Sequence, residues 1–536
     1  MTLSDTKPWW QGSFGYQIYI RSFADSNNDG YGDFEGIRSK IPYLKDLGID
    51  FLWITPFYPS PMADWGYDVA EYCDIDPTFG NLDDFDALVE QAHESGIKIV
   101  ADLVPNHTSD QHKWFKEARK GPENEFRDYY IWKDPAPDGG PPNNWVAYFG
   151  GPAWTFDETS GQYYMHLFLP EQPDLNWRNP KILEEFDQIL RFWLERGVDG
   201  FRIDVAGGLM KDEQFRSNPE ITPWDPEGDR WEQFESFEHR YDIFQEDNHE
   251  IFRRWRSIFD EHGAYLHGET YILEPSGLAE LLPGDGLHGG FWFEPMHIEW
   301  DPDEIRRSVV EVSDLVGESI LWAAGSHDMP RSPTRFGNDD TGRFRTLALN
   351  TLFSFLPGVP VIYQGEELGL IDGDVPEEHK LDPVALNDKQ FGGRDGCRTP
   401  MPWSSSSNEG GHLIINGFSE AQPWLISKQR DASETAEAQI GKPDSWHSYY
   451  KELLHTRRSL PDLTGLEVTW LDSGQGPILW YERGPVGVVI NTSSESELVK
   501  LSLDSEIVYK TPQVEMTETG EEIVISGAGA FIYLRD

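Results

Sequence analysis

Apolar positions along the chain follow two patterns, a helical repeat of polar and apolar residues and short apolar runs typical of buried strands. The helix-like segments span 37–47, 82–95 and 184–196. The strand-like segments span 16–23, 51–55, 97–104, 198–204, 264–268, 290–293, 320–325 and 359–363. A helix that leads into a short buried strand is the repeat unit of an α/β fold. Eight such strands with intervening helices therefore predict a (β/α)₈ TIM barrel.

Two stretches depart from this alternation. Between 108 and 172, Pro, Gly, Asp and Trp are frequent and the helical repeat fades, over a length too great for an ordinary barrel loop. From about 461 onward, short alternating stretches separated by Gly and Ser predict an antiparallel β domain. We therefore expect a barrel over 1–107 and 173–460, an inserted domain over 108–172, and a C-terminal β domain over 461–536.

Four of the predicted strands end in polar side chains. These are Asp102, Asn106 and His107; Arg202 and Asp204; His267, Glu269 and Thr270; and Ser326, His327 and Asp328. The carboxyl ends of parallel barrel strands meet at one rim, where ligands bind. An Arg beside an Asp favours the ionised carboxylate that a glycosyl-transferring nucleophile needs. Taken alone, the Arg202–Asp204 pair is equally well explained as a structural ion pair.

In their order and spacing, these four strand ends resemble the signature regions of the α-amylase superfamily (glycoside hydrolase family 13). A fifth segment, Gln172-Pro-Asp174-Leu-Asn176, is similar to that of the oligo-1,6-glucosidase and α-glucosidase branch. The resemblance covers nearly the whole chain. It implies that the insert after the third strand is a domain B that forms one wall of the pocket, and that the substrate is an α-linked glucoside.

The resemblance also implies roles for individual residues. Asp204 is the expected nucleophile, Glu269 the general acid and then base, and Asp328 a ligand of the sugar hydroxyls. A retaining reaction predicts ~5–5.5 Å between the carboxyl groups of Asp204 and Glu269. The implied substrate-binding residues are Asp64, Tyr67, His107, Phe149, Phe168, Gln172, Arg202, His327 and Arg398. Arg398 is the expected partner of Asp64, with Arg394 as the alternative.

Purely structural explanations remain open for several of these residues. The segment from Asp64 to Asp68 is also explained as a turn formed by Asp and Gly. Each His is also explained as a buried histidine whose hydrogen bonds serve only the fold. Relatives mostly have Asn where Ser326 stands, so we expect the positioning of Asp328 to differ in detail. Val205 favours α-1,6 action within this branch, whereas other segments are similar to enzymes that act on maltose, which leaves the bond preference open.

The predicted function is a retaining, exo-acting α-glucosidase that releases α-glucose from the non-reducing end of short maltose- or isomaltose-type glucosides by double displacement. A transglucosylase or a trehalose-synthase-like isomerase shares every catalytic residue and is the alternative. A non-catalytic relative would lack an essential carboxylate, and all three are present.

Oxygen-bearing residues alternate directly after the first predicted strand. They are Asp25, Asn27, Asp29, Tyr31 and Asp33, with Gly30 at the sixth position of an EF-hand-like loop. The twelfth position holds Gly36 instead of the usual Glu. We predict a structural Ca²⁺ or Mg²⁺ here, with an unmetallated acidic turn as the alternative, and no organic cofactor.

The formal net charge of −50, from 94 acidic and 44 basic residues, disfavours nucleic acid and anionic membranes as partners. We see no secretory leader over 1–10 and no apolar run near the ~20 residues of a membrane span. Cys73 and Cys397 are the two cysteines, so we expect free thiols in the cytoplasm, or one bond if the fold joins them. The expected partner is a small α-glucoside, and the expected state is a monomer or homodimer.

Overall fold

The computed structural model describes residues 7–272, 274–282, 284–385, 392–405, 417–472, 474–517 and 522–535. Eight parallel strands close into a barrel in the spatial order β1-β11-β10-β9-β8-β7-β3-β2. They are β1 (Gly15–Ile18), β2 (Phe51–Ile54), β3 (Lys98–Leu103), β7 (Gly200–Ile203), β8 (Tyr265–Gly268), β9 (Gly289–Trp292), β10 (Ile320–Trp322) and β11 (Val359–Tyr363). The predicted (β/α)₈ barrel is confirmed.

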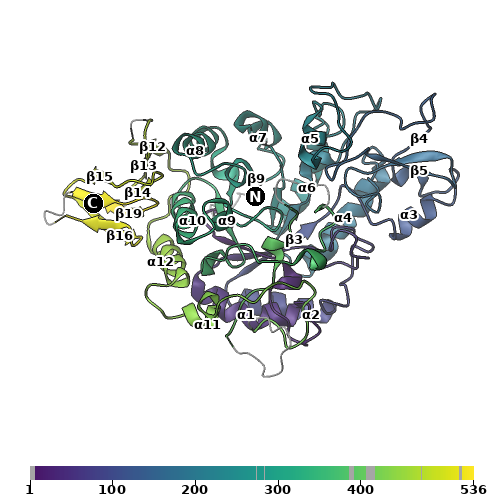
Figure 1. Ribbon diagram of the computed structural model, residues 1–536. Helices are drawn as coiled ribbons and strands as arrows, with labels where there is room; N and C mark the ends of the chain where they lie inside the picture. The colour runs from purple at the N-terminus through teal and green to yellow at the C-terminus, as the bar shows by residue number, and fades with distance from the viewer. Residues whose placement is uncertain are drawn as a thin grey trace.

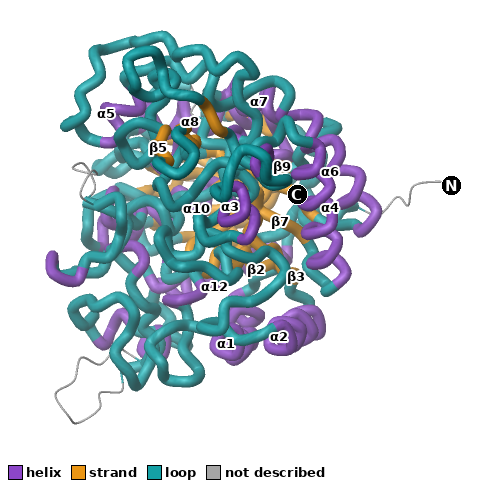
Figure 2. Tube along the Cα trace, turned by 90° about the vertical axis from the view of Figure 1, so that its right-hand side faces the viewer, coloured by secondary structure: helices purple, strands orange, loops and turns teal. Residues whose placement is uncertain are grey.

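Helices surround the barrel strands, as the tube view shows (Figure 2). The longer ones are α1 (Phe34–Leu47), α2 (Leu82–Glu94), α4 (Pro180–Glu195), α6 (Asn248–His262), α8 (Pro302–Val316), α10 (Asp340–Phe353) and α12 (Trp446–Ser459). Shorter helices are α3 (Lys113–Ala118), α5 (Arg230–Glu235), α7 (Pro275–Leu281), α9 (Ser332–Arg335) and α11 (Ala436–Gln439). None of the described helices is long and apolar enough to cross a membrane.

Helix α4 shows why the sequence forms these elements. Asn179 accepts a hydrogen bond from the backbone N–H of Lys181, and Pro180 occupies the first turn, so the helix begins four residues before the apolar repeat indicates. Its apolar face buries Phe186, Leu190 and other residues against the barrel. The chain then turns into β7, which carries Arg202 and delivers Asp204 to the barrel rim.

Two sets of antiparallel strands lie outside the barrel. β4 (Trp132–Lys133), β6 (Gln162–Met165) and β5 (Trp154–Asp157) form a small sheet within the predicted insert. After α12, eight strands form one five-stranded and one three-stranded sheet, which confirms the C-terminal β architecture. They are β12 (Val468–Trp470), β13 (Ile478–Arg483), β14 (Val486–Asn491), β15 (Glu497–Lys500), β16 (Ser505–Lys510), β17 (Val514–Met516), β18 (Glu522–Ile525) and β19 (Ala530–Arg535).

The sheet of the insert and the two C-terminal sheets lie at opposite ends of the molecule, with the barrel between them (Figure 1). The exact domain boundaries stay predictions, and positions 1 and 536 of the predicted ranges lie outside the described residues. The barrel interior is filled by side chains that include Trp53, Tyr265, Phe291 and Leu321, with Trp10 packed beside Tyr265. The barrel is therefore a packed core, and its rim is left to hold a site.

Candidate active site

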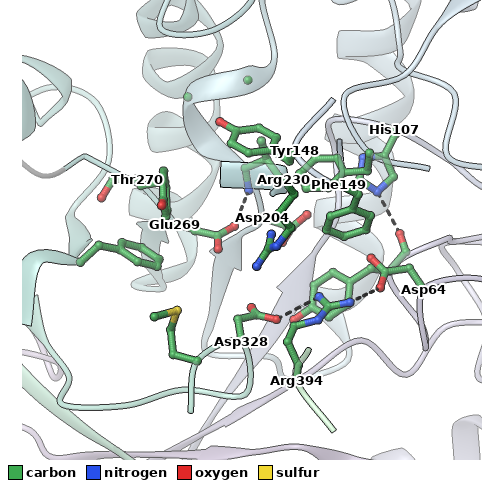
Figure 3. A pocket seen from close by; sticks show the side chains of 18 of the residues that line it. Asp64, His107, Tyr148, Phe149, Asp204, Arg230, Glu269, Thr270, Asp328 and Arg394 are labelled. Atoms are coloured by element: carbon green, nitrogen blue, oxygen red, sulfur yellow. Dashed lines mark hydrogen bonds and ion pairs between the residues drawn. The ribbon is translucent and has the colours of Figure 1, made fainter. Parts of the chain in front are cut away.

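A pocket opens at the carboxyl ends of the barrel strands (Figure 3). Eight of the predicted site residues line it: Asp64, Tyr67, His107, Phe149, Phe168, Asp204, Glu269 and Asp328. The other four, Gln172, Arg202, His327 and Arg398, are buried behind the lining and hydrogen-bond to residues of it. The structure thus brings together all twelve residues that the sequence assigned to catalysis and sugar binding.

Arg202 joins three carboxylates beneath the pocket. Its Nη1 donates to Asp102 at 2.8 Å and to Asp204 at 2.6 Å, and its Nη2 lies 3.1 Å from Oε2 of Glu269. The same Glu269 oxygen accepts a hydrogen bond from the backbone N–H of Val205 at 3.0 Å. Strands β7 and β8 are paired in parallel, so Asp204 and Glu269 follow neighbouring strand ends. One guanidinium therefore holds the expected nucleophile and the expected acid in fixed positions.

The electrostatics of this cluster differ from the sequence expectation. Burial raises the pKa of Asp204 above that of an ordinary aspartate, and Arg202 only partly opposes the rise. Burial likewise raises the pKa of Asp102 to about 6, again opposed by Arg202. The sequence analysis expects Arg202 to favour the ionised form of Asp204. Arg202 does act in that direction, but burial and the neighbouring carboxylates have the larger effect on the pKa of Asp204.

Asp328 lies among positive and polar groups. Its Oδ1 accepts from Arg398 at 2.7 Å and from Arg394 at 3.2 Å, and its Oδ2 lies 3.2 Å from Nε2 of His327. Burial alone would raise the pKa of Asp328, but His327 and the neighbouring arginines together lower it below the ordinary value. Asp328 is therefore held as a carboxylate that accepts hydrogen bonds.

Asp64 and Arg394 meet across one end of the pocket at 2.8 Å (Figure 3). Arg394 also binds Asp382 at 2.8 Å, whereas Arg398 donates to the carbonyl oxygen of His327 and to Asp328. The partner of Asp64 is thus Arg394, the alternative in the sequence assignment, and Arg398 instead anchors Asp328. The two arginines are four residues apart around a 3₁₀ turn, so the sequence did not show which one faces Asp64.

Four buried polar residues support this end of the pocket. Gln172 donates to Asp64 at 3.3 Å and lies 3.0 Å from Nε2 of His107, whose pKa burial lowers to about 4. The Tyr67 hydroxyl lies 2.7 Å from Nε2 of His327, and the two rings stack at 5.5 Å. Burial also lowers the pKa of His327. Both histidines are therefore neutral near pH 7.

Aromatic rings form the rest of the lining, and most were missed by the sequence analysis. Ring contacts run from His107 to Phe168 (5.2 Å), on to Tyr148 (5.1 Å), to Tyr271 (6.2 Å) and to Trp231 (5.5 Å). Further lining residues not predicted are Arg230, Phe244, Thr270, Phe293, Met329, Gly207 and Gly208. Many come from the irregular segment 205–247, where no periodicity marks a residue that faces the pocket.

Comparison with known proteins agrees with this geometry. A model of the alpha amylase catalytic domain matches residues 17–464. The chain belongs to the alpha-amylase family. It is 38% identical over 517 residues to a probable alpha-glucosidase of Rhizobium meliloti, covering 94% of this chain and 92% of that protein. It is 38% identical over 487 residues to an oligo-1,6-glucosidase of Heyndrickxia coagulans, covering 84% and 85%.

A solved structure shares the whole architecture. The crystal structure of an alpha-glucosyl transfer enzyme superposes with a TM-score of 0.90 at 34% identity, covering 99% of this chain and 100% of that one. The family resemblance inferred from five short motifs is thus confirmed.

Two residues next to the carboxylates make backbone contacts that hold the site. Ser326 Oγ accepts a hydrogen bond from the backbone N–H of Asp328 at 3.2 Å. Val205, directly after Asp204, has φ of 48°, a left-handed conformation that is rare for a β-branched residue. Its backbone N–H donates to Glu269.

The predicted metal loop forms a tight turn of oxygen-bearing side chains. Asp25 accepts from the N–H groups of Asn28 and Gly30, and Asn27 and Asp29 each accept from the residue two places on. Asp33 accepts from Ser26 and caps α1 through Gly36. Among the described residues, no three His, Cys, Asp or Glu side chains lie close enough to hold a metal. The all-oxygen donor set suits a hard cation, but the carboxylates are spread around the turn.

Proposed function

We propose that this member of the alpha-amylase family is a retaining, exo-acting α-glucosidase that releases α-glucose from short α-glucosides. The observation that carries the proposal is that Arg202 contacts both Asp204 and Glu269 beside a pocket whose far end is closed by the Asp64–Arg394 pair. A closed polar end accepts one terminal sugar, which suits release of single glucose units. The names of the relatives, alpha-glucosidase and oligo-1,6-glucosidase, support the same activity.

In the first step, Glu269 donates its proton to the glycosidic oxygen as the bond from that oxygen to the anomeric carbon breaks. The carboxylate of Asp204 bonds to the anomeric carbon and gives a glucosyl-enzyme. The step needs the negative charge on Asp204 and the proton on Glu269. Arg202 contacts Asp204 at 2.6 Å and Glu269 at 3.1 Å, and its charge opposes the rise that burial causes in the pKa of Asp204.

In the second step, Glu269 takes a proton from water, and the water oxygen bonds to the anomeric carbon as the Asp204 ester breaks. Two inversions leave the α configuration of the substrate unchanged. Asp328 and Asp64 accept hydrogen bonds from hydroxyls of the bound glucose, and neutral His107 in the pocket lining donates to one. These contacts tighten as the ring distorts toward the transition state. His327, predicted from the sequence to donate as well, lies behind the lining and positions Tyr67 and Asp328.

The proposal is tested by following purified enzyme with maltose, isomaltose, trehalose and sucrose by NMR. The expected first product is α-glucose from maltose or isomaltose, which also identifies the preferred bond. Release of β-glucose would contradict the retaining mechanism. An Asp204→Ala variant that kept full turnover would contradict the assignment of the nucleophile.

A glucosyl transferase or isomerase is the second candidate. The solved structure of an alpha-glucosyl transfer enzyme, at 34% identity over nearly the whole chain, favours it. The two activities differ in whether water or a sugar hydroxyl reaches the glucosyl-enzyme. If new disaccharides accumulate with little free glucose at high maltose concentration, the main activity is transfer rather than hydrolysis.

We also propose that the loop from Asp25 to Asp33 binds structural Ca²⁺ or Mg²⁺ through Asp25, Asn27, Asp29, Asp33 and the carbonyl oxygen of Tyr31. The oxygen donors of the loop support this, and a fall in melting temperature on chelation, reversed by Ca²⁺, tests it. Both cysteines are free in the structure, which supports a reducing cytoplasm as the location. A monomer or homodimer stays our expectation, to be measured by light scattering.

A further inference from the structure

Arg21 is a buried cation without a carboxylate partner in the part of the chain that the structure describes. It lies in the 3₁₀ turn Ile20–Ser22 that comes after strand β1, and it is only 1% exposed. Its Nη2 donates to the sulfur of Met62 at 3.2 Å, and its Nη1 has no hydrogen-bond partner. Burial accordingly lowers the pKa of Arg21, although Tyr19 and Asp76 partly oppose this. A buried charge that lacks an ion pair needs another source of stabilisation.

Four aromatic rings surround this guanidinium. Its central carbon lies 5.9 Å from the ring centre of Tyr19, 5.4 Å from Trp65, 5.3 Å from Phe79 and 5.5 Å from Trp424. Cation–π attraction is stronger when the cation is desolvated, up to about 2 kcal/mol for one contact. The rings therefore replace a counter-ion, and Arg21 in turn holds the rings in place.

Trp65 belongs to a tight turn that carries two residues of the proposed glucose site. The N–H of Tyr67 donates to the carbonyl oxygen of Asp64 at 3.1 Å. Between them, Trp65 has φ of 50° and Gly66 φ of 111°. Positive φ at both central positions is the pattern of a type I′ turn, which a bulky residue such as Trp disfavours by roughly 1–2 kcal/mol.

The turn also lies directly against Arg21. A Cβ atom added at Gly66 would lie 3.1 Å from the carbonyl oxygen of Pro56 and 3.3 Å from Nη2 of Arg21. The ring of Trp65 packs against Trp424 at 4.8 Å, and its Nε1 donates to the carbonyl oxygen of Leu381. The strained conformation of the turn is thus maintained by contacts to the Trp65 ring rather than by local preference.

We propose that Arg21 is a positioning residue for sugar binding: by holding the Trp65 ring, it fixes the strained turn that places Asp64 and Tyr67 in the pocket. The inference rests on the proposed function of that pocket. Arg21 itself does not line the pocket and touches no reacting atom. Without Arg21, the turn relaxes to a less strained conformation. The side chains of Asp64 and Tyr67 are then no longer held in the positions that contact the terminal glucose.

The test compares Arg21→Met, Arg21→Lys and Trp65→Leu with wild type and with Arg191→Met, a control at an exposed arginine on α4. Glucose affinity is measured by titration calorimetry, and KM and kcat are measured with the α-glucoside that the wild type cleaves best. The melting temperature of each variant shows whether it folds. We expect Arg21→Met and Trp65→Leu each to weaken glucose binding and raise KM at least tenfold, with a smaller change in kcat. Arg21→Lys should recover part of the loss, and the control should match wild type.

A double variant, Arg21→Met with Trp65→Leu, should bind glucose no more weakly than the worse single variant, because both changes release the same turn. If Arg21→Met does not fold, Trp65→Leu carries the test, since it keeps the cation and three rings. Folded variants that bind glucose within twofold of wild type would overturn the inference. If wild type neither binds glucose nor cleaves α-glucosides, the proposed function has failed instead.

Discussion

Lys211 joins three segments beneath the pocket, and its removal should leave a buried carboxylate without a partner of opposite charge. Its Nζ lies 2.7 Å from Oδ2 of Asp174, donates to Oδ1 of Asn106 at 2.8 Å, and donates to the carbonyl oxygen of Gly208. Lys211 is 3% exposed and Asp174 is fully buried. A Lys211→Met substitution keeps most of the volume but leaves the Asp174 carboxylate without its counter-ion.

The magnitude follows from the buried charge that the substitution leaves unpaired. Removing one partner of a buried ion pair costs about 3–5 kcal/mol, because the remaining charge has no water around it. The Asp174 side chain is fully buried, so we expect a loss of that size in this part of the molecule.

Native-state hydrogen exchange measures this locally, which matters because a chain with several sheets and a barrel need not unfold in one step. The amides of Asp174 and Leu175, which bond to Met165 and Asn106, report the opening free energy. Adding Asp174→Asn to Lys211→Met should restore more than half of the loss. A loss that Asp174→Asn does not restore would refute the argument from charge.

Three further outcomes follow from individual features. Burial raises the pKa of Glu366 to about 7, so the wild type should lose stability as the pH rises from 4.5 to 7. The stability of Glu366→Gln should not fall over this pH range. At pH 8 the variant should therefore be more stable than the wild type by up to about 3 kcal/mol, as measured by denaturation at several pH values. Ser326→Ala removes the acceptor of the Asp328 N–H and should lower kcat/KM about tenfold, whereas Ser326→Asn should stay within threefold of wild type. Because the net charge is −50, 1 M KCl should raise the melting temperature by several degrees over 0.05 M, and an unchanged value would contradict self-repulsion as a limit on stability.

The sequence predicted the barrel because its strands and helices carry distinct apolar patterns. Predicted and observed strand ends agree within one residue at β2 and β3, and within two at β7. The first strand differs more, because the apolar run 16–23 continues past β1 into a 3₁₀ turn at Ile20–Ser22. Every residue of that run is buried, so its hydrophobicity does not reveal where the extended backbone ends.

Site residues that follow a barrel strand could be predicted from the fold, whereas those on loops were predicted through the family resemblance alone. Asp204, Glu269 and Asp328 come shortly after barrel strands, so the fold brings them to one rim. Trp231 on the short helix α5 and Lys211 in the loop before it carry no such signal, and only the structure shows that one lines the pocket and the other binds Asp174 from beneath. Arg21 has no pattern of its own, since its partners Trp65, Phe79 and Trp424 are distant in sequence.

The cluster around Arg202 explains why these particular residue types share one strand end. A guanidinium has a planar fork of donors, so two of its nitrogens reach Asp102, Asp204 and Glu269 at once, which a lysine ammonium would do less well. Three carboxylates against one cation leave an excess of negative charge in a buried place, and keeping one proton within the cluster relieves it. A double displacement needs one protonated and one ionised carboxyl group, because one must donate a proton while its neighbour attacks the anomeric carbon. Burial of three carboxyl groups beside one arginine therefore favours a state in which one carboxyl keeps its proton. In that state one member of the pair can act as acid and the other as nucleophile.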